Sequence, residues 1–366
     1  MAVRIPLLAD AIDAVERPIA SADAGTVSGF RYPSGVHAVR IRSTRVELIV
    51  LPFVGQQVWR LTVDGEDLTM RTMFDEPLDV PDFRQSYGAF LMHCGLAGMG
   101  HPGPSDAHPV HGELPVARYQ RAWIEAGEDG AGPWLAISGE YVHRVSHTLH
   151  YAFVPRLTVR PDSRTIELRA GIENRRGTDL AYQYLCHVNW AHGPGELIQP
   201  VPMTPSGFRL YADAAPDEET RQLMHELAVD PSRSNRLSAD DHVVPEYVAL
   251  TRPLAGHDGW AHYLLRRPDG SAAWVGFDTA HLPYAIRWIS RTPDESAAGF
   301  CLPCTSHHLG RARATEDGML RIVPARARDE MHLRVGLLDV DEVAVHAAAI
   351  RERLARADIQ PGVAVT

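Results

Sequence analysis

Short β-rich runs separated by turn-forming residues recur along this chain, and few helical patterns interrupt them. Residues 117–191 contain the runs ARYQRAWIEA, WLAISGEYV, SHTLHYAFVPRLTVR, TIELRAGIENR and LAYQYLCHVNWA, with EDGAGP, RPDS and NRRGTD as separators. Residues 38–72 add further strands, with Asp64-Gly65 as a tight hairpin turn. Strands that follow one another without crossover helices pair antiparallel. We therefore predict an all-β, antiparallel architecture with a few short helices.

Two segments depart from this strand pattern. Residues 211–245 combine the amphipathic run DEETRQLMHEL with a polar loop, which predicts a helical insertion that is either a surface feature or a lid over a site. Residues 341–356 read DEVAVHAAAIRERLAR and predict a C-terminal helix with Asp341 as N-cap. Because we find no fixed-period repeat and no proline-rich linker, we predict a single domain over residues 1–366, with residues 1–37 as an N-terminal extension.

Composition excludes several classes of function. The net charge of −10 excludes nucleic acid and anionic membrane as partners, because both are bound through clustered cations. All 36 basic residues are arginine, since the sequence contains no lysine. Schiff-base chemistry, pyridoxal phosphate anchoring and P-loop nucleotide binding are therefore excluded. The apolar share of 45% provides ample material for a core, so we expect a globular protein.

The termini and cysteines favour a cytoplasmic location. Asp10, Asp13 and Glu16 interrupt the N-terminal apolar run before a signal-peptide core is complete. No run of 18 apolar residues occurs, so we expect no membrane span. Four cysteines in so long a chain do not make a disulfide framework. Cys301 and Cys304 form a lone C-x-x-C, which we interpret as buried inert thiols rather than half of a zinc site.

Residues 89–117 are the stretch richest in chemistry. Its histidines lie among glycines and prolines, which favour an irregular loop able to present a site. The run GMGHPG within it has the spacing of a dinucleotide fingerprint, but Pro102 and Pro104 preclude the helix that the fingerprint requires. We therefore interpret that match as chance. The histidines of the loop are His93, His101, His108 and His111.

Two histidines stand out as candidates for acid and base chemistry. His111 and Glu113 are two residues apart, so both would point to one face if this run is extended. Such a pair can act on a sugar as acid and base, or bind a divalent metal with a third histidine. His187 lies in an apolar strand-like run with Asn189 on the same face. Residues in such runs are also often simply packed in a core.

Three segments, in this order, resemble the aldose 1-epimerase (galactose mutarotase-like) superfamily, in particular its DUF4432-type branch. FLMHCGLAGMGHPGPSDAHPVHGELPVA is similar to that branch's cysteine-glycine-leucine stretch followed by His-Gly. LTVRPDSRTIELRAGIENRRGTDLAYQYLCHVNWAHG is similar to its strand pair ending in His-x-Asn. LPYAIRWISRTPDESAAGFCLPCTSHHLGRA lies where the family has Leu-Pro, a Trp and then Glu-Pro-x-Thr before Gly-Arg. With the opening strands, the resemblance covers roughly residues 40–340.

The resemblance implies a galactose mutarotase-like β-supersandwich with a sugar pocket on one concave face. His187 matches the histidine that protonates the ring oxygen of the sugar, and His111 matches the one that helps to hold that oxygen. We expect an isomerase of the aldose 1-epimerase type that acts on a free sugar or sugar derivative and needs no cofactor. The catalytic residues would be His187, His111 and Glu113, and the further sugar-binding residues would be Asn189, Asp278, His308, Arg84 and Trp190.

One position departs from the family pattern. The family's catalytic base is the glutamate of Glu-Pro-x-Thr, and Leu302 stands at that position in Cys-Leu-Pro-Cys-Thr. Leucine cannot accept a proton, so the acid is retained while the usual base is absent. Either Glu113, Asp278 or His308 has become the base, or the protein binds a carbohydrate without converting it.

A further alternative uses a metal. His111, Glu113 and His187 would hold a divalent cation, which favours isomerase, epimerase or lyase chemistry through an enolised keto sugar. The sequence does not rank these alternatives. The partner expected in all of them is a small-molecule carbohydrate, with neither nucleic acid nor membrane, and a homodimer is compatible with the sequence.

Overall fold

The computed structural model describes residues 2–211, 217–357 and 364–365. The chain divides into two compact units. The first comprises the chain up to Thr69 together with Phe74–His187 and Ser306–His332, and the second comprises Met70–Met73, Val188–Thr305 and the chain from Leu333 onwards. Both units consist mainly of antiparallel strands, so the all-β prediction is confirmed. A single domain over residues 1–366 stays a prediction.

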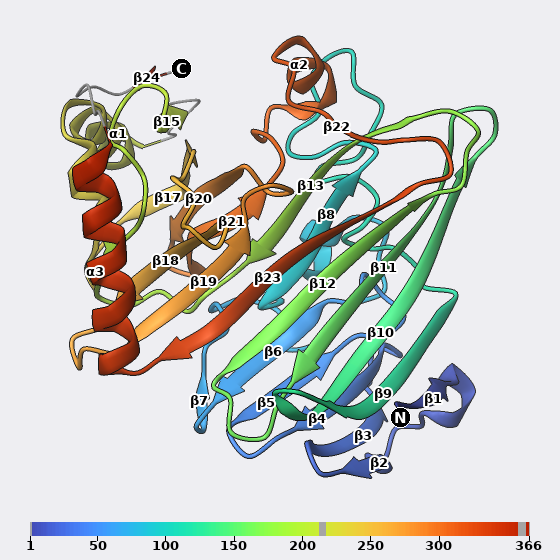
Figure 1. Ribbon diagram of the computed structural model, residues 1–366. Coiled ribbons are helices and arrows are strands. Elements are labelled where there is room, and N and C mark those ends of the chain that lie inside the picture. The colour runs from blue at the N-terminus through green and yellow to red at the C-terminus, as the bar shows by residue number, and fades with distance from the viewer. Residues whose placement is uncertain (1, 212–216, 358–363, 366) are drawn as a thin grey trace. The chain divides into compact units, whose positions relative to one another are not determined.

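The first unit contains the strands β1 (Val3–Leu7), β2 (Arg17–Ala22), β3 (Gly25–Arg31), β4 (His37–Arg42), β5 (Val46–Val50), β6 (Val58–Val63), β7 (Glu66–Asp67), β8 (Leu91–Leu96), β9 (Arg121–Asp129), β10 (Gly132–Val145), β11 (Leu149–Val159), β12 (Thr165–Asn174), β13 (Leu180–Val188) and β22 (Arg321–Val323). It also contains the short helices η1 (Ala9–Ala11), η2 (Phe83–Ser86) and α2 (Gly310–Glu316). One sheet segment has the order β1-β9-β10-β11-β12, and β9 to β12 lie side by side in Figure 1. A second has the order β2-β3-β4-β5-β6-β8-β13, with β7 paired to β6 and β22 to β13.

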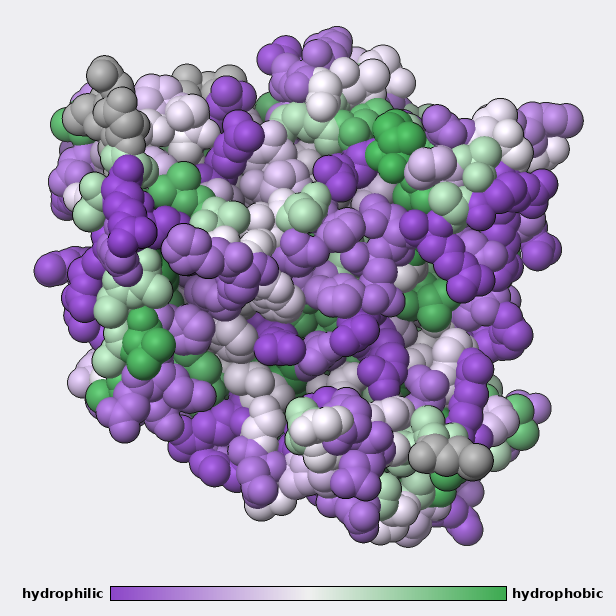
Figure 2. Space-filling model, in the orientation of Figure 1, coloured by the Kyte–Doolittle hydropathy of each residue, from purple (hydrophilic) through white to green (hydrophobic). Residues whose placement is uncertain are grey.

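Local sequence accounts for these strands. Val46, Leu48 and Val50 of β5 are buried while the residues between them are partly exposed, as a sheet with one buried face requires. The Asp64-Gly65 hairpin is confirmed: both residues have positive φ, and Val63 pairs with Glu66. Figure 2 shows mostly hydrophilic side chains over β10 to β12 on the face seen, broken by small apolar spots.

The N-terminal extension predicted for residues 1–37 is an integral part of the first unit. Its first strand, β1, pairs with β9 over Val3–Leu7, and β3 pairs with β4. The family resemblance could not show this pairing, because it begins only near residue 40. The backbone hydrogen bonds of these strands therefore join the extension to the sheets of the unit.

The second unit contains β14 (Gly195–Ile198), β15 (Phe208–Tyr211), β16 (Arg236–Leu237), β17 (Val243–Thr251), β18 (Trp260–Arg266), β19 (Ala272–Asp278), β20 (Tyr284–Arg291), β21 (Ser296–Cys304), β24 (Ala364–Val365) and residues 333–338 of β23 (Arg328–Leu338). Its strand orders are β23-β19-β18-β14-β16 and β21-β20-β17-β15-β24. The helix α3 (Val340–Arg356) lies beside β18 and β19 in Figure 1, and its Val343 and Ile350 pack with Trp274 in a buried apolar cluster.

The helix expected between residues 211 and 245 is present as α1 (Glu218–Val229), and a 3-10 turn, η3 (Pro231–Asn235), follows it. The Asp217 side chain accepts a hydrogen bond from Thr220 N and caps α1. Both elements belong to the second unit. Residues 212–216 of this segment lie outside the described residues.

The C-terminal helix is confirmed, but its cap differs from the prediction. Asp339, not Asp341, is the N-cap, and it forms a capping box with Glu342. Asp341 lies in the first turn instead. The sequence offers an aspartate at both positions, and the end of β23 at Leu338 determines which one begins the helix.

Replacing the two aspartates separately tests this assignment. We expect Asp339→Ala to lower the free energy of unfolding by about 1 kcal/mol, because the first turn loses a capping acceptor. Asp341→Ala should lower the free energy of unfolding by only about 0.3 kcal/mol, because one charge near a helix N-terminus contributes little. Urea denaturation of both variants measures the difference, and equal effects would contradict the capping box.

Among the described residues, no helix is both long enough and apolar enough to cross a membrane. All four cysteines are buried and none is in a disulfide. This confirms our interpretation of Cys301 and Cys304 as buried thiols, and both lie on β21.

Candidate functional site

The histidine-rich loop folds back against the end of β8. Gly95 N donates to His111 O at 2.9 Å, and Leu114 N donates to Gly95 O at 2.9 Å. His111 N in turn donates to Gly100 O at 2.9 Å. These bonds close the loop on itself, so an irregular segment has one defined path.

Two glycines are required for this path. A Cβ on Gly100 would lie 1.8 Å from the carbonyl oxygen of His308, and a Cβ on Gly112 would lie 2.3 Å from that of Gly98. Both glycines also have positive φ, a backbone conformation that is unfavourable for residues with a Cβ atom. The close approach at Gly100 places residues 308–309 directly on the loop, where His101 N donates to His308 O at 2.8 Å. No helix follows the run GMGHPG, in agreement with our rejection of a dinucleotide fingerprint.

Asp106 attaches the loop to helix α2. Its carboxylate accepts backbone N–H groups of Gly103 at 2.9 Å, Arg311 at 3.1 Å and Ala312 at 2.8 Å. The residue that precedes the helix, Leu309, has no capping side chain, so Asp106 caps α2 from another segment. The guanidinium of Arg311 donates to the carbonyl oxygen of Ala97 and so returns to the same loop.

The loop, β13 and the segment before α2 bring histidines together within the first unit. The ring centroids of His111 and His187 are 5.5 Å apart at an interplanar angle of 79°. His101 lies 6.4 Å from His111 by the same measure. His187 is buried, whereas His101 is exposed. We call this group the imidazole cluster, and it comprises His101, His108, His111, His187 and His308.

Aromatic rings border the cluster. Phe83 lies 5.4 Å from His111, and Tyr87 lies 6.0 Å from His187, as ring-centroid distances. Both come from η2 and the residue after it. His111 and His187, which are far apart in the chain, thus lie close together in the first unit, and their catalytic roles stay a prediction.

Burial keeps part of the cluster neutral. Desolvation lowers the pKa of His111 well below its ordinary value, and the neighbouring imidazoles, His187 foremost, lower it further. Desolvation, together with His101 and His307, lowers the pKa of His308 to about 4. Both side chains are thus uncharged near pH 7 and can accept a proton. The Nδ1 atom of His111 is buried and has no hydrogen-bond partner among the described residues.

The geometry predicted for Glu113 is wrong. His111 and Gly112 have φ values of 60° and 78°, so the run is a turn and not an extended strand whose alternate residues share a face. The Glu113 carboxylate instead accepts N–H groups of Leu96 at 2.8 Å and Ala97 at 3.0 Å, as well as the hydroxyl of Tyr151. It therefore fixes the start of the loop and is poorly placed to serve as a free base.

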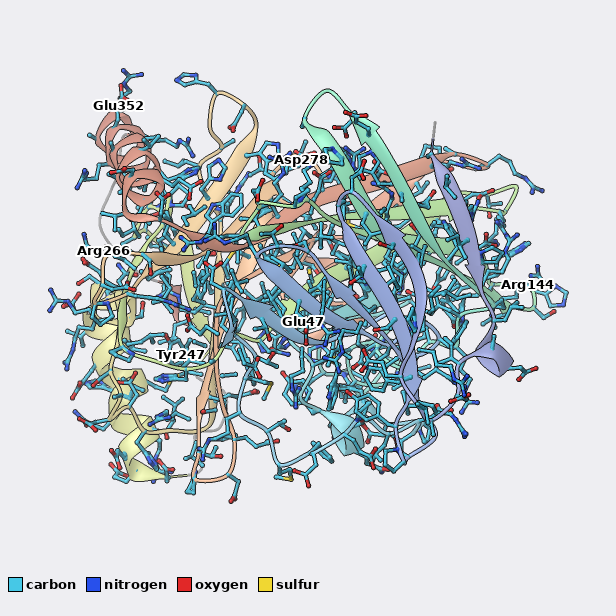
Figure 3. All side chains as sticks on the ribbon, turned by 90° about the horizontal axis from the view of Figure 1, so that it is seen from below. Glu47, Arg144, Tyr247, Arg266, Asp278 and Glu352 are labelled. Carbon is cyan, nitrogen blue, oxygen red and sulfur yellow. The ribbon has the colours of Figure 1, made fainter. Side chains whose placement is uncertain are left out.

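The remaining predicted residues are distributed over both units. Arg84 is exposed and pairs with Asp82 at 2.7 Å in the first unit. Asp278, labelled in Figure 3, ends β19 in the second unit, and its carboxylate lies 2.6 Å from His281 Nδ1. The other positions of the second unit considered in the sequence analysis are Asn189, Trp190 and Leu302, and all three side chains are buried.

The metal alternative finds no support in the arrangement of side chains. Across residues 2–211, 217–357 and 364–365, no group of three or more His, Cys, Asp or Glu side chains is placed to hold a metal ion. In particular, the oxygens of Glu113 are engaged by Leu96, Ala97 and Tyr151.

His93, on β8, has a structural environment. It is fully buried, its Nδ1 lies 2.7 Å from the hydroxyl of Tyr184, and its ring packs 5.0 Å from that of Phe153. Burial lowers its pKa to about 3. In the unfolded chain His93 binds a proton below about pH 6.5, whereas in the folded chain it does so only near pH 3. The contribution of neutral His93 to the free energy of unfolding is therefore complete above pH 6.5 and declines as the pH falls towards 3.

This linkage predicts a pH-dependent stability. Between about pH 6 and pH 4, His93 should make the free energy of unfolding fall by about 1.4 kcal/mol per pH unit. His93→Gln removes the titrating group, so its slope over that interval should be smaller by this amount whatever its absolute stability. Denaturation curves of both proteins across the interval measure the slopes, and identical slopes would contradict a neutral buried His93.

Some residues of the site were not predicted from the sequence. His101 and His108 had a visible signal, since they share the loop with His111, but no role was assigned to them. Asp106, Arg311 and Tyr151 act through contacts with residues distant in the chain, and nothing in their local sequence indicates those contacts.

Comparisons with known proteins agree with this structure. The model of a family described as a domain of unknown function, DUF4432, matches residues 33–337. No curated protein matches the sequence.

Solved structures show the same fold. A Klebsiella pneumoniae protein provisionally described as an aldose 1-epimerase aligns with a TM-score of 0.83 and 16% identity, covering 100% of this chain and 98% of that one. A galactose mutarotase-like protein of Clostridium acetobutylicum has a TM-score of 0.58 and 10% identity, over 87% and 100% of the two chains. An Escherichia coli protein, also provisionally described as an aldose 1-epimerase, has a TM-score of 0.51 and 15% identity, over 82% and 98%. The predicted galactose mutarotase-like β-supersandwich is thereby confirmed.

Proposed function

This chain belongs to the DUF4432 family, and from that premise we propose that it is an isomerase of the aldose 1-epimerase type that interconverts the anomers of a sugar at the imidazole cluster. One observation carries the proposal: the ring centroid of His111, which desolvation keeps neutral, lies 5.5 Å from that of a second imidazole, His187. The provisional descriptions of the structural neighbours as aldose 1-epimerases support the same class of reaction.

The two imidazoles suffice for the proton transfers of ring opening. His111, uncharged, takes the proton of the anomeric hydroxyl, the bond between C1 and the ring oxygen breaks, and His187 delivers a proton to that oxygen. Rotation about C1–C2 exposes the other face of the aldehyde, and the reverse transfers close the ring. Both oxygens are bound to C1, so one acid and one base a few ångströms apart can reach them together.

With His111 as the base, the reaction does not require the glutamate that serves as catalytic base in the family. Leu302 stands at that position and cannot accept a proton. Of the substitutes considered, Glu113 is engaged by three donors and Asp278 by His281. His308 is kept neutral as well and is the second candidate for the base. Glu113 then becomes a positioning residue that holds the loop.

Exchange between anomers provides the direct test. In saturation-transfer NMR with a panel of aldoses and sugar derivatives, the protein should accelerate exchange between the α and β signals of at least one sugar above the buffer rate. The substitution of the family's glutamate favours a second candidate, a protein that binds a carbohydrate without converting it. Thermal stabilisation by a sugar with no accelerated exchange for any member of the panel would favour that candidate and overturn the isomerase.

We place this activity in the cytoplasm, with a small-molecule carbohydrate as partner. A chain of this length with only four cysteines, all of them free and buried, is typical of proteins in a reducing compartment. The proton transfers above require no cofactor. Whether the chain acts as a homodimer does not enter the mechanism, since both imidazoles come from one chain.

A further inference from the structure

Residues 306–317, which we call the α2 segment, contact the loop that carries His111. The carboxylate of Asp106 in this loop accepts two N–H groups from the first turn of α2, at 3.1 and 2.8 Å. In the opposite direction, Nη1 of Arg311 donates to the carbonyl oxygen of Ala97 at 3.0 Å. The position of α2 therefore constrains the loop at two separate points.

The α2 segment also contacts β13, the strand that carries His187. Nη2 of Arg311 donates to the carbonyl oxygen of Ala181 on this strand at 3.1 Å. The buried side chains of Gln183 and Ser306 form a further hydrogen bond, from Nε2 to Oγ at 2.8 Å. All of these residues belong to the first unit. One segment thus binds both the loop and the strand that bring the two paired imidazoles together.

His307 connects the two ends of α2. Leu309, which precedes the helix, donates its N–H to Nδ1 of His307 at 3.2 Å. Nε2 of the same ring lies 3.0 Å from Oδ2 of Asp317, the residue that follows the helix. An imidazole that accepts through Nδ1 and faces a carboxylate through Nε2 is neutral and carries its proton on Nε2. One buried side chain therefore holds both ends of a helix of seven residues.

The charged groups near His307 agree with a neutral ring. Burial lowers the pKa of His307, and the Asp317 carboxylate opposes this effect in part. The guanidinium of Arg313, on α2, adds to the lowering and also binds Asp317, with Nε 3.0 Å from Oδ2. Arg313 is exposed, whereas His307 is only 1% exposed. The two side chains share one carboxylate but differ in burial, so they can be compared directly by substitution.

We propose that His307 is a positioning residue: by fixing α2, it sets the separation of His111 and His187. The inference rests on the proposed function, because that reaction needs an acid and a base held at a fixed separation. A shift of α2 would reach both imidazoles at once, since the loop and β13 are bound by the same guanidinium, that of Arg311. A displacement of about 1 Å at a reacting group can cost about 10²-fold in rate.

The kinetics of anomeric exchange in the full chain test this role. In His307→Ala, kcat should fall about 10- to 100-fold while KM changes by less than about threefold, because the acid and the base are displaced from each other. In His307→Asn the amide oxygen can replace Nδ1 as acceptor for the N–H of Leu309, so this variant should recover much of the lost kcat. A folded His307→Ala variant with a kcat within about threefold of the wild type would overturn the inference. Equal kcat values in the two variants, or a change confined to KM, would also overturn it.

Arg313→Gln is the matched control. It removes the exposed partner of Asp317 from the same helix and leaves both hydrogen bonds of His307 in place. Its kcat should stay within about twofold of the wild type, since an exposed ion pair contributes little. A loss as large as that of His307→Ala would mean that any disturbance of α2 slows the reaction, which would remove the specific role of His307. Circular dichroism establishes that each variant is folded.

Amide hydrogen exchange separates this inference from the proposed function. In His307→Ala, exchange at residues 97–106 and 309–312 should be about tenfold faster or more, because the hydrogen bonds between α2 and the loop open more often. Arg313→Gln should show no such change in residues 97–106. Faster exchange in a protein that accelerates no sugar would retain the constraint of His307 on the loop and remove the isomerase. Unchanged exchange at residues 97–106 in His307→Ala would overturn the inference, whatever rate the wild type shows with sugars.

Discussion

His187→Ala should reduce the rate of enzyme-catalysed anomeric exchange by about 10²- to 10⁴-fold, the usual contribution of a general acid. The alanine leaves nothing to protonate the ring oxygen, so the bond between C1 and that oxygen breaks only as fast as water can supply the proton. His111→Ala should cause a loss of the same order, because it removes the partner 5.5 Å away. Saturation-transfer NMR with the preferred sugar measures both.

The double variant and one control make the result specific. If the two imidazoles act on one transition state, His111→Ala in the His187→Ala background should cost far less than it does alone, since groups that act as a unit are not additive. His225→Ala, on helix α1 of the second unit and outside the imidazole cluster, should leave the rate unchanged. Because His187 is buried, circular dichroism must show that its variant is folded, and His187→Asn, closer in size, provides a second test. Folded variants with wild-type rates would remove the imidazole pair from the mechanism.

The fold was predictable because its signals are local and repeated. The alternation in β5 and the positive-φ turn at Asp64-Gly65 are properties of a few adjacent residues, and the structure has both. The C-terminal helix was equally visible, yet its cap was not. Asp339 and Asp341 are equally good caps in sequence terms, and only the end of β23 selects between them.

The site was predictable only in part, for a physical reason. The resemblance named His111 and His187, and they do meet. Glu113 would share a face with His111 only in an extended backbone, whereas His111 adopts a φ of 60°, which few residues with side chains adopt. That conformation is imposed by the hydrogen bond from Gly95 N to His111 O and the close approach of Gly112, neither of which a pattern of residue types reveals.

Glu113→Ala should lower the free energy of unfolding by about 3 kcal/mol. The carboxylate accepts the N–H groups of Leu96 and Ala97 and the hydroxyl of Tyr151, and each donor left unsatisfied in a partly buried site costs roughly 1 to 3 kcal/mol. Water that enters the loop should hydrogen-bond to some of the freed donors and so offset part of this loss of stability. Tyr151→Phe removes one of the three hydrogen bonds and should cost about 1 kcal/mol, which guanidinium denaturation can resolve.

Glu113→Gln distinguishes an anchor from a base. The amide keeps an acceptor oxygen for the backbone N–H groups, so an anchoring role predicts a small loss of stability and a fall in activity of less than about tenfold. A catalytic base has no such tolerance: glutamine cannot take a proton, so the rate would fall by about 10² or more with stability nearly intact. The pH profile separates the two roles further, since loss of a base would remove the acidic limb of the activity curve, whereas a weakened anchor would leave that limb, set by His111, in place. A large rate loss in a stable variant lacking that limb would return Glu113 to the catalytic role and displace His111 from it.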